Sequence, residues 1–163
     1  MNILLTGNNG FIGSKFMTLF AKKYNIKGLD NNYFYEDHNF DSDSFIKKDI
    51  RNIEISDLDN INVEVHMAEL CNDPLSDLNP ELTVDINVNA TQKLIKLCNN
   101  SNVQKIIYMS SCSVYGKSED EIGDEKSDVA GLTEYAKAKI SNENFINDND
   151  FDNLEIIMLR NAT

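Results

Sequence analysis

What this sequence has little of narrows the classes of protein to which it can belong. Its 163 residues include three cysteines and two prolines. No apolar run approaches the roughly 20 residues of a membrane-spanning helix. Cys71, Cys98 and Cys112 are odd in number and too far apart for a paired-cysteine metal knuckle, so we expect no metal site. The thiols fit a reducing compartment, and the start of the chain lacks a basic segment and a cleavage site. We therefore expect a cytoplasmic protein without a signal peptide.

Basic residues are also scarce, with 15 lysines and arginines against 27 acids and a net charge of −12. Because no basic stripe offsets this charge, we expect neither DNA nor any other nucleic acid as a partner. Acids gather at residues 119–125 and 148–152, which favours a solvated loop and a helix end. Hydrophobic residues make up 41% of the chain, enough for one domain with its own core.

Segments typical of strands and of helices alternate along the chain. Strands are expected at residues 3–5, 26–29, 45–46, 63–67, 106–109 and 154–159, helices at 11–24, 79–98 and 133–146, and a polar, aromatic loop at 31–44. The second helix has a clear start, because Asn79 can cap it, Pro80 fits its first turn and Glu81 suits its positive end. This alternation predicts an α/β fold: a doubly wound parallel sheet of about six strands with helices on both faces, in one domain spanning residues 1–163.

Three glycines punctuate T-G-N-N-G-F-I-G, residues 6–13, between the first strand and the first helix. In a nucleotide-binding turn, Gly7 would permit the sharp bend, Gly10 would let the backbone approach a pyrophosphate, and Gly13 would let the helix pack on the sheet. The helix N-terminus would add amides and positive potential. The spacing differs from the G-x-G-x-x-G of many dehydrogenases, so a glycine-rich turn without a ligand remains an alternative.

An acid follows at the end of the second predicted strand. There Asp30 could accept hydrogen bonds from both hydroxyls of a ribose. Its carboxylate would repel a 2′-phosphate, and Asn31 and Asn32 provide no arginine to bind one. The sequence thus predicts NAD rather than NADP, although Asp30 by itself could be an ordinary polar strand end.

Two further features suggest chemistry. Tyr135 and Lys139 stand four residues apart on a predicted helix and share a face, and a nearby ammonium favours the phenolate of a tyrosine whose ordinary pKa is about 10. Ser111 ends the fifth predicted strand at its carboxyl edge, where ligands of open α/β sheets bind. The tyrosine–lysine pair alone could also be an ordinary surface pair.

Together these motifs resemble the extended short-chain dehydrogenases/reductases, specifically the NAD-dependent epimerase/dehydratase family acting on nucleotide sugars. Residues 6–13 are similar to the family's T-G-x-x-G-F-I-G, and Asp49-Ile50-Arg51 to its adenine-contacting D-I/L-R. Residues 65–68 resemble V-x-H-L-A-A up to the first alanine, with Glu69 replacing the second. Residues 87–91, N-V-N-A-T, are close to N-x-x-G-T, while S-S-C-S-V-Y-G at 110–116 and Y-A-K-A-K at 135–139 complete the set.

The resemblance implies a role for each matching residue. Tyr135 would take a proton from a sugar hydroxyl while hydride passes to NAD. Lys139 would hold the nicotinamide ribose and lower the tyrosine pKa, Ser111 would hydrogen-bond the reacting oxygen, and Asn87 would help to order the cofactor end of the site. The implied cofactor contacts are Gly7, Asn9, Gly10, Phe11, Ile12, Gly13, Asp30, Asn31, Asp49, Ile50, Met67, Ala68, Asn87, Tyr135 and Lys139.

Other residues favour plainer interpretations. His66 fits a packed strand-end histidine better than a base, and Cys112, with no histidine paired to it, fits an inert thiol. The family's 4,6-dehydratases carry Asp-Glu after the catalytic threonine, whereas Cys112 and Ser113 stand here. Neither can supply that acid and base, so the resemblance favours an epimerase.

The resemblance also implies a homodimer through helices 79–98 and 133–146. The row Ile86, Ala90, Leu94 and Cys98 would give it an apolar face, unless that row covers the sheet. Family members continue beyond the sixth strand with a smaller domain that grips the nucleotide sugar, which we expect this chain to lack. Two hypotheses stay open: the cofactor domain of a nucleotide-sugar epimerase, and a catalytically silent NAD-binding module.

Overall fold

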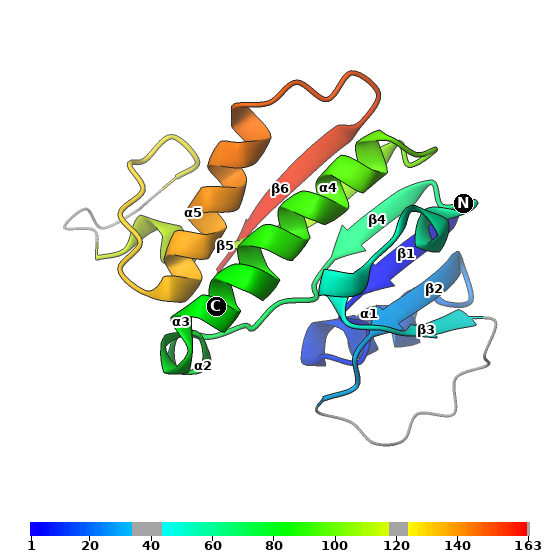
Figure 1. Ribbon diagram of the computed structural model, residues 1–163, viewed down its shortest axis with the longest axis horizontal. Coiled ribbons are helices and arrows are strands. Elements are labelled where there is room, and N and C mark those ends of the chain that lie inside the picture. The colour runs from blue at the N-terminus through cyan, green and yellow to red at the C-terminus, as the bar shows by residue number, and fades with distance from the viewer. Residues whose placement is uncertain (34–43, 118–123, 163) are drawn as a thin grey trace.

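One parallel sheet forms the centre of the molecule, whose computed structural model describes residues 1–33, 44–117 and 124–162. Six strands are arranged in the order β3-β2-β1-β4-β5-β6 (Figure 1). They are β1 (Asn2–Thr6), β2 (Asn25–Asp30), β3 (Phe45–Lys47), β4 (Val63–His66), β5 (Lys105–Ser111) and β6 (Glu155–Asn161). The order reverses between β1 and β4, and in doubly wound sheets ligands bind outside the carboxyl ends of the strands at this switch point. The predicted α/β fold is confirmed.

Side chains alternate between the two faces of the sheet along each strand, so apolar side chains lie on both faces. Helices cover both of these faces. Helix α1 (Phe11–Phe20) packs on one face over Ile3, Leu5, Ile26 and Val65. On the other face, α4 (Thr91–Asn99) and α5 (Glu134–Asn147) lie side by side (Figure 1). The larger core beneath them includes Leu4, Leu94, Ile106, Tyr108 and Ile146.

The helix predicted for residues 79–98 is present, although it is not uniformly α-helical. It runs as α3 (Pro80–Thr83), a π-helical segment (Val84–Ala90) and α4. The Asn79 side chain accepts a hydrogen bond from the Leu82 N–H at 3.1 Å, so the predicted cap is confirmed.

The apolar row on this helix is buried against the chain's own sheet. Ile86, Ala90, Leu94 and Cys98 are each at most 6% exposed. Their four-residue spacing exceeds the roughly 3.6 residues of an α-helical turn, so in a uniform α-helix the row would drift around the axis. The wider turn of the π segment offsets that drift. The row therefore covers the sheet, and it is not a free dimer face.

Most predicted elements agree with the observed bounds, and the exceptions have local causes. The first helix ends at Phe20 instead of residue 24. Short helices without a readable period were missed: α2 (Asp73–Leu78) and 3-10 turns at Ile50–Asn52, Ile55–Leu58 and Cys112–Tyr115. Most of the predicted loop at 31–44 and of the acidic cluster at 119–125 falls outside the described residues, whereas Asp148 ends α5 as expected.

The described ranges contain neither a membrane-spanning helix nor a metal-binding cluster. None of their helices combines the length and the apolar character that crossing a bilayer requires. They also contain no cluster of three or more His, Cys, Asp or Glu side chains placed to hold a metal ion.

Candidate active site

The glycine turn between β1 and α1 has the shape that its sequence predicts. Gly7 adopts a φ of +73°, and a Cβ there would lie 2.6 Å from the Met67 carbonyl oxygen. A Cβ on Gly13 would lie 2.2 Å from the Gly7 carbonyl oxygen, so α1 could not approach the turn. At Gly10, by contrast, the nearest atom would be 3.2 Å away, and this residue is exposed. The turn is thus closed toward the protein and open on its outer side, at the start of α1.

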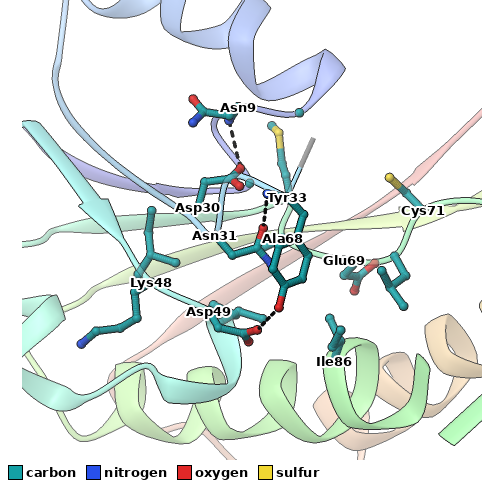
Figure 2. Close-up of a pocket in the computed structure, with 16 residues that line it drawn as sticks. Asn9, Asp30, Asn31, Tyr33, Lys48, Asp49, Ala68, Glu69, Cys71 and Ile86 are labelled. Atoms are coloured by element: carbon teal, nitrogen blue, oxygen red, sulfur yellow. Dashed lines mark hydrogen bonds between the residues drawn. The ribbon is translucent and has the colours of Figure 1, made fainter. Parts of the chain in front are cut away.

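Asp30 lies at the end of β2, as predicted, and connects the glycine turn to the segment after the strand. One carboxylate oxygen accepts from the Asn9 N–H at 3.1 Å (Figure 2). The other accepts from the Asn32 N–H at 2.8 Å. The Asn9 side chain also donates to that of Asn32. Asn32 has a φ of 60°, and this left-handed conformation lets the chain turn back toward Asp30.

A pocket opens between the glycine turn and the carboxyl ends of β2 and β4 (Figure 2). Nine predicted cofactor contacts line it: Gly7, Asn9, Gly10, Asp30, Asn31, Asp49, Ile50, Met67 and Ala68. Sequence reasoning missed seven others, namely Leu29, Tyr33, Lys48, Glu69, Leu70, Cys71 and Ile86. Four of these, Leu29, Lys48, Glu69 and Ile86, directly adjoin predicted contacts in the sequence, and Glu69 also carried a signal as a departure from the family motif.

Charges at the outer rim of the pocket are paired. Hydrogen bonds from Arg51 hold the pKa of Asp49 below its usual range, and Arg51 also reaches Asp85 at 3.1 Å. The Tyr33 hydroxyl donates to Asp49 at 3.5 Å. Lys48 lies 2.7 Å from Asp57, so its charge is already matched by a carboxylate.

The predicted reacting residues are brought together at the carboxyl edge of β5. Ser111 ends this strand and Tyr135 lies in the first turn of α5, close enough that the Ser111 hydroxyl lowers the pKa of the tyrosine. Lys139 lies one turn further along, with its ammonium nitrogen 5.4 Å from the centre of the Tyr135 ring. These three do not line the pocket, but Glu69, which does, reaches Lys139.

Lys139 is not a free cation. Its ammonium donates to the Glu69 carboxylate and to the Met109 carbonyl oxygen, and the residue is 2% exposed. Burial, followed by the negative charge of Glu69, raises the pKa of Tyr135 to about 12, while the hydrogen bond with Ser111 acts in the opposite direction. Burial and nearby carboxylates thus dominate the pKa of Tyr135, while Lys139 is paired with Glu69. The lowering of the tyrosine pKa by Lys139 stays a prediction.

Asn87 is fully buried and contacts the protein rather than the pocket. Its side-chain oxygen accepts from the Leu70 N–H at 2.8 Å, and its amide donates to the Leu70 carbonyl at 3.0 Å. It thereby fixes the segment that carries Glu69. His66 is likewise buried, with its ring nitrogens 2.8 Å from the hydroxyls of Thr6 and Thr91, so the prediction of a packed histidine is confirmed.

Comparison with known proteins identifies the family. The model of the NAD dependent epimerase/dehydratase family matches residues 3–163. The chain belongs to this family. The predicted membership is confirmed, and the expected cofactor, NAD, is the one that the family's description names.

Individual relatives agree with this assignment. The chain is 31% identical over 150 residues to a protein described as a putative UDP-glucose 4-epimerase from Methanocaldococcus jannaschii, covering 88% of this chain and 49% of that protein. It superposes with a TM-score of 0.89 and 26% identity on UDP-N-acetylglucosamine 4-epimerase from Methanobrevibacter ruminantium, solved in complex with UDP-N-acetylmuramic acid, covering 98% of this chain and 54% of that one. The human dTDP-D-glucose 4,6-dehydratase is 29% identical over 160 residues, covering 88% of this chain and 45% of that protein.

Two facts follow from these similarities. The chain spans about half the length of the relatives it matches. Epimerases and dehydratases both appear among them, so similarity alone does not separate the two reactions.

Proposed function

We propose that this chain is the NAD-binding domain of a nucleotide-sugar epimerase/dehydratase-like enzyme that transfers hydride at a sugar carbon, with an epimerase favoured. The observation that carries the proposal is the meeting of Ser111, Tyr135 and Lys139 at one sheet edge, next to a pocket lined by the glycine turn. A glycine-rich turn alone would account for the pocket but not for these three side chains.

The pocket suits a dinucleotide in three respects. Gly10 leaves its outer side open for a pyrophosphate, and the first N–H groups of α1 have no intrahelical partner there, which favours an anion. Phe11 and Ile12, 81% and 56% exposed, stand at this helix start. Asp30 is placed to accept from ribose hydroxyls and to repel a 2′-phosphate, and Lys48 is neutralised by Asp57. NAD, when bound, would supply the hydride acceptor.

The reacting residues would act on the sugar. Ser111 would donate a hydrogen bond to the sugar oxygen that changes oxidation state. Tyr135 would accept the proton of that hydroxyl and later return it. Because Ser111 is close enough to influence the pKa of Tyr135, these two groups can hold one oxygen between them.

The segment after Ser111 supports epimerisation over dehydration. Cys112 and Ser113 form the start of a 3-10 turn, and the Ser113 N–H donates to the Ser111 hydroxyl at 3.2 Å. A thiol and a hydroxyl at these positions cannot provide the carboxylic acid and carboxylate that eliminate water in the resembled dehydratases. Epimerisation needs only that hydride leave and return on opposite faces of the sugar.

A catalytically silent NAD-binding module is the second candidate. One observation favours it: Glu69 is paired with Lys139, so the ammonium is already matched by a carboxylate.

A homodimer through helices 79–98 and 133–146 also stays a prediction, as does a cytoplasmic location. Since the apolar row of the first helix covers the sheet, such a dimer would have to use the outward face of α4. That face is polar, with Gln92, Lys93, Lys96 and Asn100 lining a shallow cleft. Sedimentation at micromolar concentration tests it, and a clean monomer would count against a dimer.

Calorimetry with NAD and NADP tests the cofactor assignment. The wild-type chain should bind NAD more tightly than NADP. Asp30→Ala should weaken NAD binding about tenfold or more, because the ribose hydroxyls lose their hydrogen bonds to a charged acceptor. It should also narrow the preference for NAD over NADP. Asp30→Asn separates charge from size, and Asp152→Ala, at an exposed site, is the matched control. Equal or tighter binding of NADP by the wild type would contradict the proposal.

A further inference from the structure

An ion pair closes the inner end of the pocket. Glu69 follows β4, and Lys139 comes from the middle of α5; their side chains are 5% and 3% exposed. One Glu69 oxygen receives the ammonium of Lys139, and the other accepts from the Tyr108 hydroxyl at 3.1 Å. Both ionic groups are thus fully partnered inside the protein, as buried charges require.

The pair lies between two parts of the site. Glu69 lines the pocket together with its neighbours Leu70 and Cys71 (Figure 2). Lys139 lies on the other side of Glu69, beneath Tyr135. The segment holding the carboxylate is itself fixed, because the Asn87 side chain bonds both main-chain groups of Leu70. This clamp holds the backbone next to the residue from which the carboxylate extends.

We propose that Glu69 is a positioning residue that locks Lys139 in a closed ion pair, so that the ammonium neither reaches a bound ribose nor favours the phenolate of Tyr135 until the pair opens. This inference rests on the proposed function for its consequence, but the lock is a property of the chain itself. It makes Glu69, a residue outside the three reacting positions, the group that decides whether they can react.

Electrostatics around Tyr135 support the lock. The groups that face its hydroxyl are Glu69, Cys71, Asp73, Ser111 and Lys139, with the Tyr108 phenol nearby. Among the described residues, carboxylates therefore face the phenol, and Lys139, the cation next to it, is paired with Glu69. An unpaired ammonium would favour the phenolate, whereas a neutralised one leaves burial and the remaining carboxylates to hold the proton on.

The first test measures the ionisation of Tyr135 without any cofactor. Isotope-labelled tyrosine and NMR follow each phenol with pH, and Tyr135→Phe assigns the signal. In the wild type, Tyr135 should remain protonated past about pH 10, the ordinary tyrosine value. In Glu69→Gln, which keeps the shape and removes the charge, its midpoint should fall by about one to two pH units. Glu155→Gln removes an exposed carboxylate, also paired with a lysine, and should change nothing.

Two further variants make this test decisive. Glu69→Ala, the residue of the family motif, should act in the same direction as Glu69→Gln if either variant folds. Lys139→Met should leave the phenol at least as hard to ionise as in the wild type. If Tyr135 titrates near its ordinary value in the wild type, or if its midpoint is the same with and without the Glu69 charge, the lock does not exist.

The second test measures NAD binding by calorimetry. If Lys139 must leave Glu69 to hold a ribose, then Glu69→Gln should bind NAD at least about threefold more tightly, because the competent state no longer has to be populated first. Weaker binding by Glu69→Gln would mean that the carboxylate builds the pocket, and would overturn the inference. If none of the chains binds NAD, the proposed function fails, while the NMR titration still decides whether Glu69 locks Lys139.

Discussion

Two regions keep their family motifs for different physical reasons: the glycine turn, and the reacting end formed by Ser111, Tyr135 and Lys139. At the glycine turn, the critical quantity is space: Gly7 and Gly13 sit where any side chain would meet backbone atoms closer than 3.0 Å. At the reacting end, the critical quantity is charge: Lys139 and Glu69 are both buried and hold each other. A steric motif can be recognised from residue types alone. An electrostatic motif depends on neighbours that the motif does not specify.

This difference explains why the same sequence supports the cofactor assignment more strongly than the catalytic one. Asp30 and Asn9 lie against the open side of the glycine turn with the polar contacts that the turn needs. Tyr135 and Ser111 are equally well placed, yet the residue after Ala68 changes the field in which they act. Geometry is retained at both ends, whereas the electrostatic environment is altered only at one.

The largest expected loss of stability comes from removing the cation of the reacting end, Lys139. Lys139→Met leaves the Glu69 carboxylate buried without its counter-ion, and breaking a buried pair in this way costs about 3–5 kcal/mol of the free energy of unfolding. Urea denaturation measures it. The double variant Lys139→Met with Glu69→Leu removes both charges and should recover most of the loss, since only neutral groups, the Tyr108 hydroxyl and the Met109 carbonyl, then lose a partner. A loss below about 1 kcal/mol in the single variant would show that the pair is not effectively buried.

The next largest loss of stability comes from adding a side chain in the glycine turn, where the backbone leaves no room for it. Gly13→Ala places a methyl group 2.2 Å from the Gly7 carbonyl oxygen, which cannot move without displacing the turn. We expect a loss of about 2–4 kcal/mol in the free energy of unfolding, as for overpacking against backbone. Gly10→Ala, whose added Cβ meets only one atom at 3.2 Å, should cost less than about 1 kcal/mol. Equal losses for the two variants would contradict the steric account.

The difference between local steric features and contacts between distant residues explains which parts of the structure could be predicted from the sequence. The sheet, its main helices, the turn at Gly7 and the ends of β2 and β5 followed from apolar period and from glycine spacing, which act locally. The π segment, α2 and the clamp from Asn87 to Leu70 were not predictable, because each depends on contacts between distant parts of the chain. The pairing of Glu69 with Lys139 joins residues 70 positions apart. Sequence marked Glu69 as a departure from the motif but not what it would contact.

A second buried carboxylate, Glu64, can be compared with Glu69, which is paired with Lys139. Glu64 in β4 is fully buried, and one of its oxygens has no hydrogen-bond partner among the described residues. Burial raises its pKa above the ordinary 4.5, opposed by the His66 ring 3.7 Å away. The folded chain thus keeps a proton that the unfolded chain has lost, so stability falls as pH rises above 4.5, up to the folded-state pKa.

Glu64→Gln should therefore stabilise the chain at about pH 8 by about 1–3 kcal/mol, the cost of an unsatisfied buried polar group. The gain should shrink as the pH falls and level off below 4.5, where both states of the wild type hold the proton. Urea denaturation across this pH range provides the measurement, with Glu155→Gln as the exposed control. A gain that stays constant with pH would mean that the carboxyl titrates normally in the fold.

The smallest expected effect concerns the residue that fixes the start of α5. Thr133 caps this helix by accepting from the Ala136 N–H at 3.2 Å, and its hydroxyl donates to Asp73 at 2.7 Å. Thr133→Ala should cost about 1 kcal/mol and fray the first turn, which carries Tyr135. Hydrogen exchange should then be faster at the Ala136 amide, while Thr133→Ser, which keeps the hydroxyl, should protect it as the wild type does. If Thr133→Ala leaves that amide as protected as before, Tyr135 is held by its packing and its bond to Ser111. The position of Tyr135 would then not depend on the cap, while burial and the Glu69 charge would still set its ionisation.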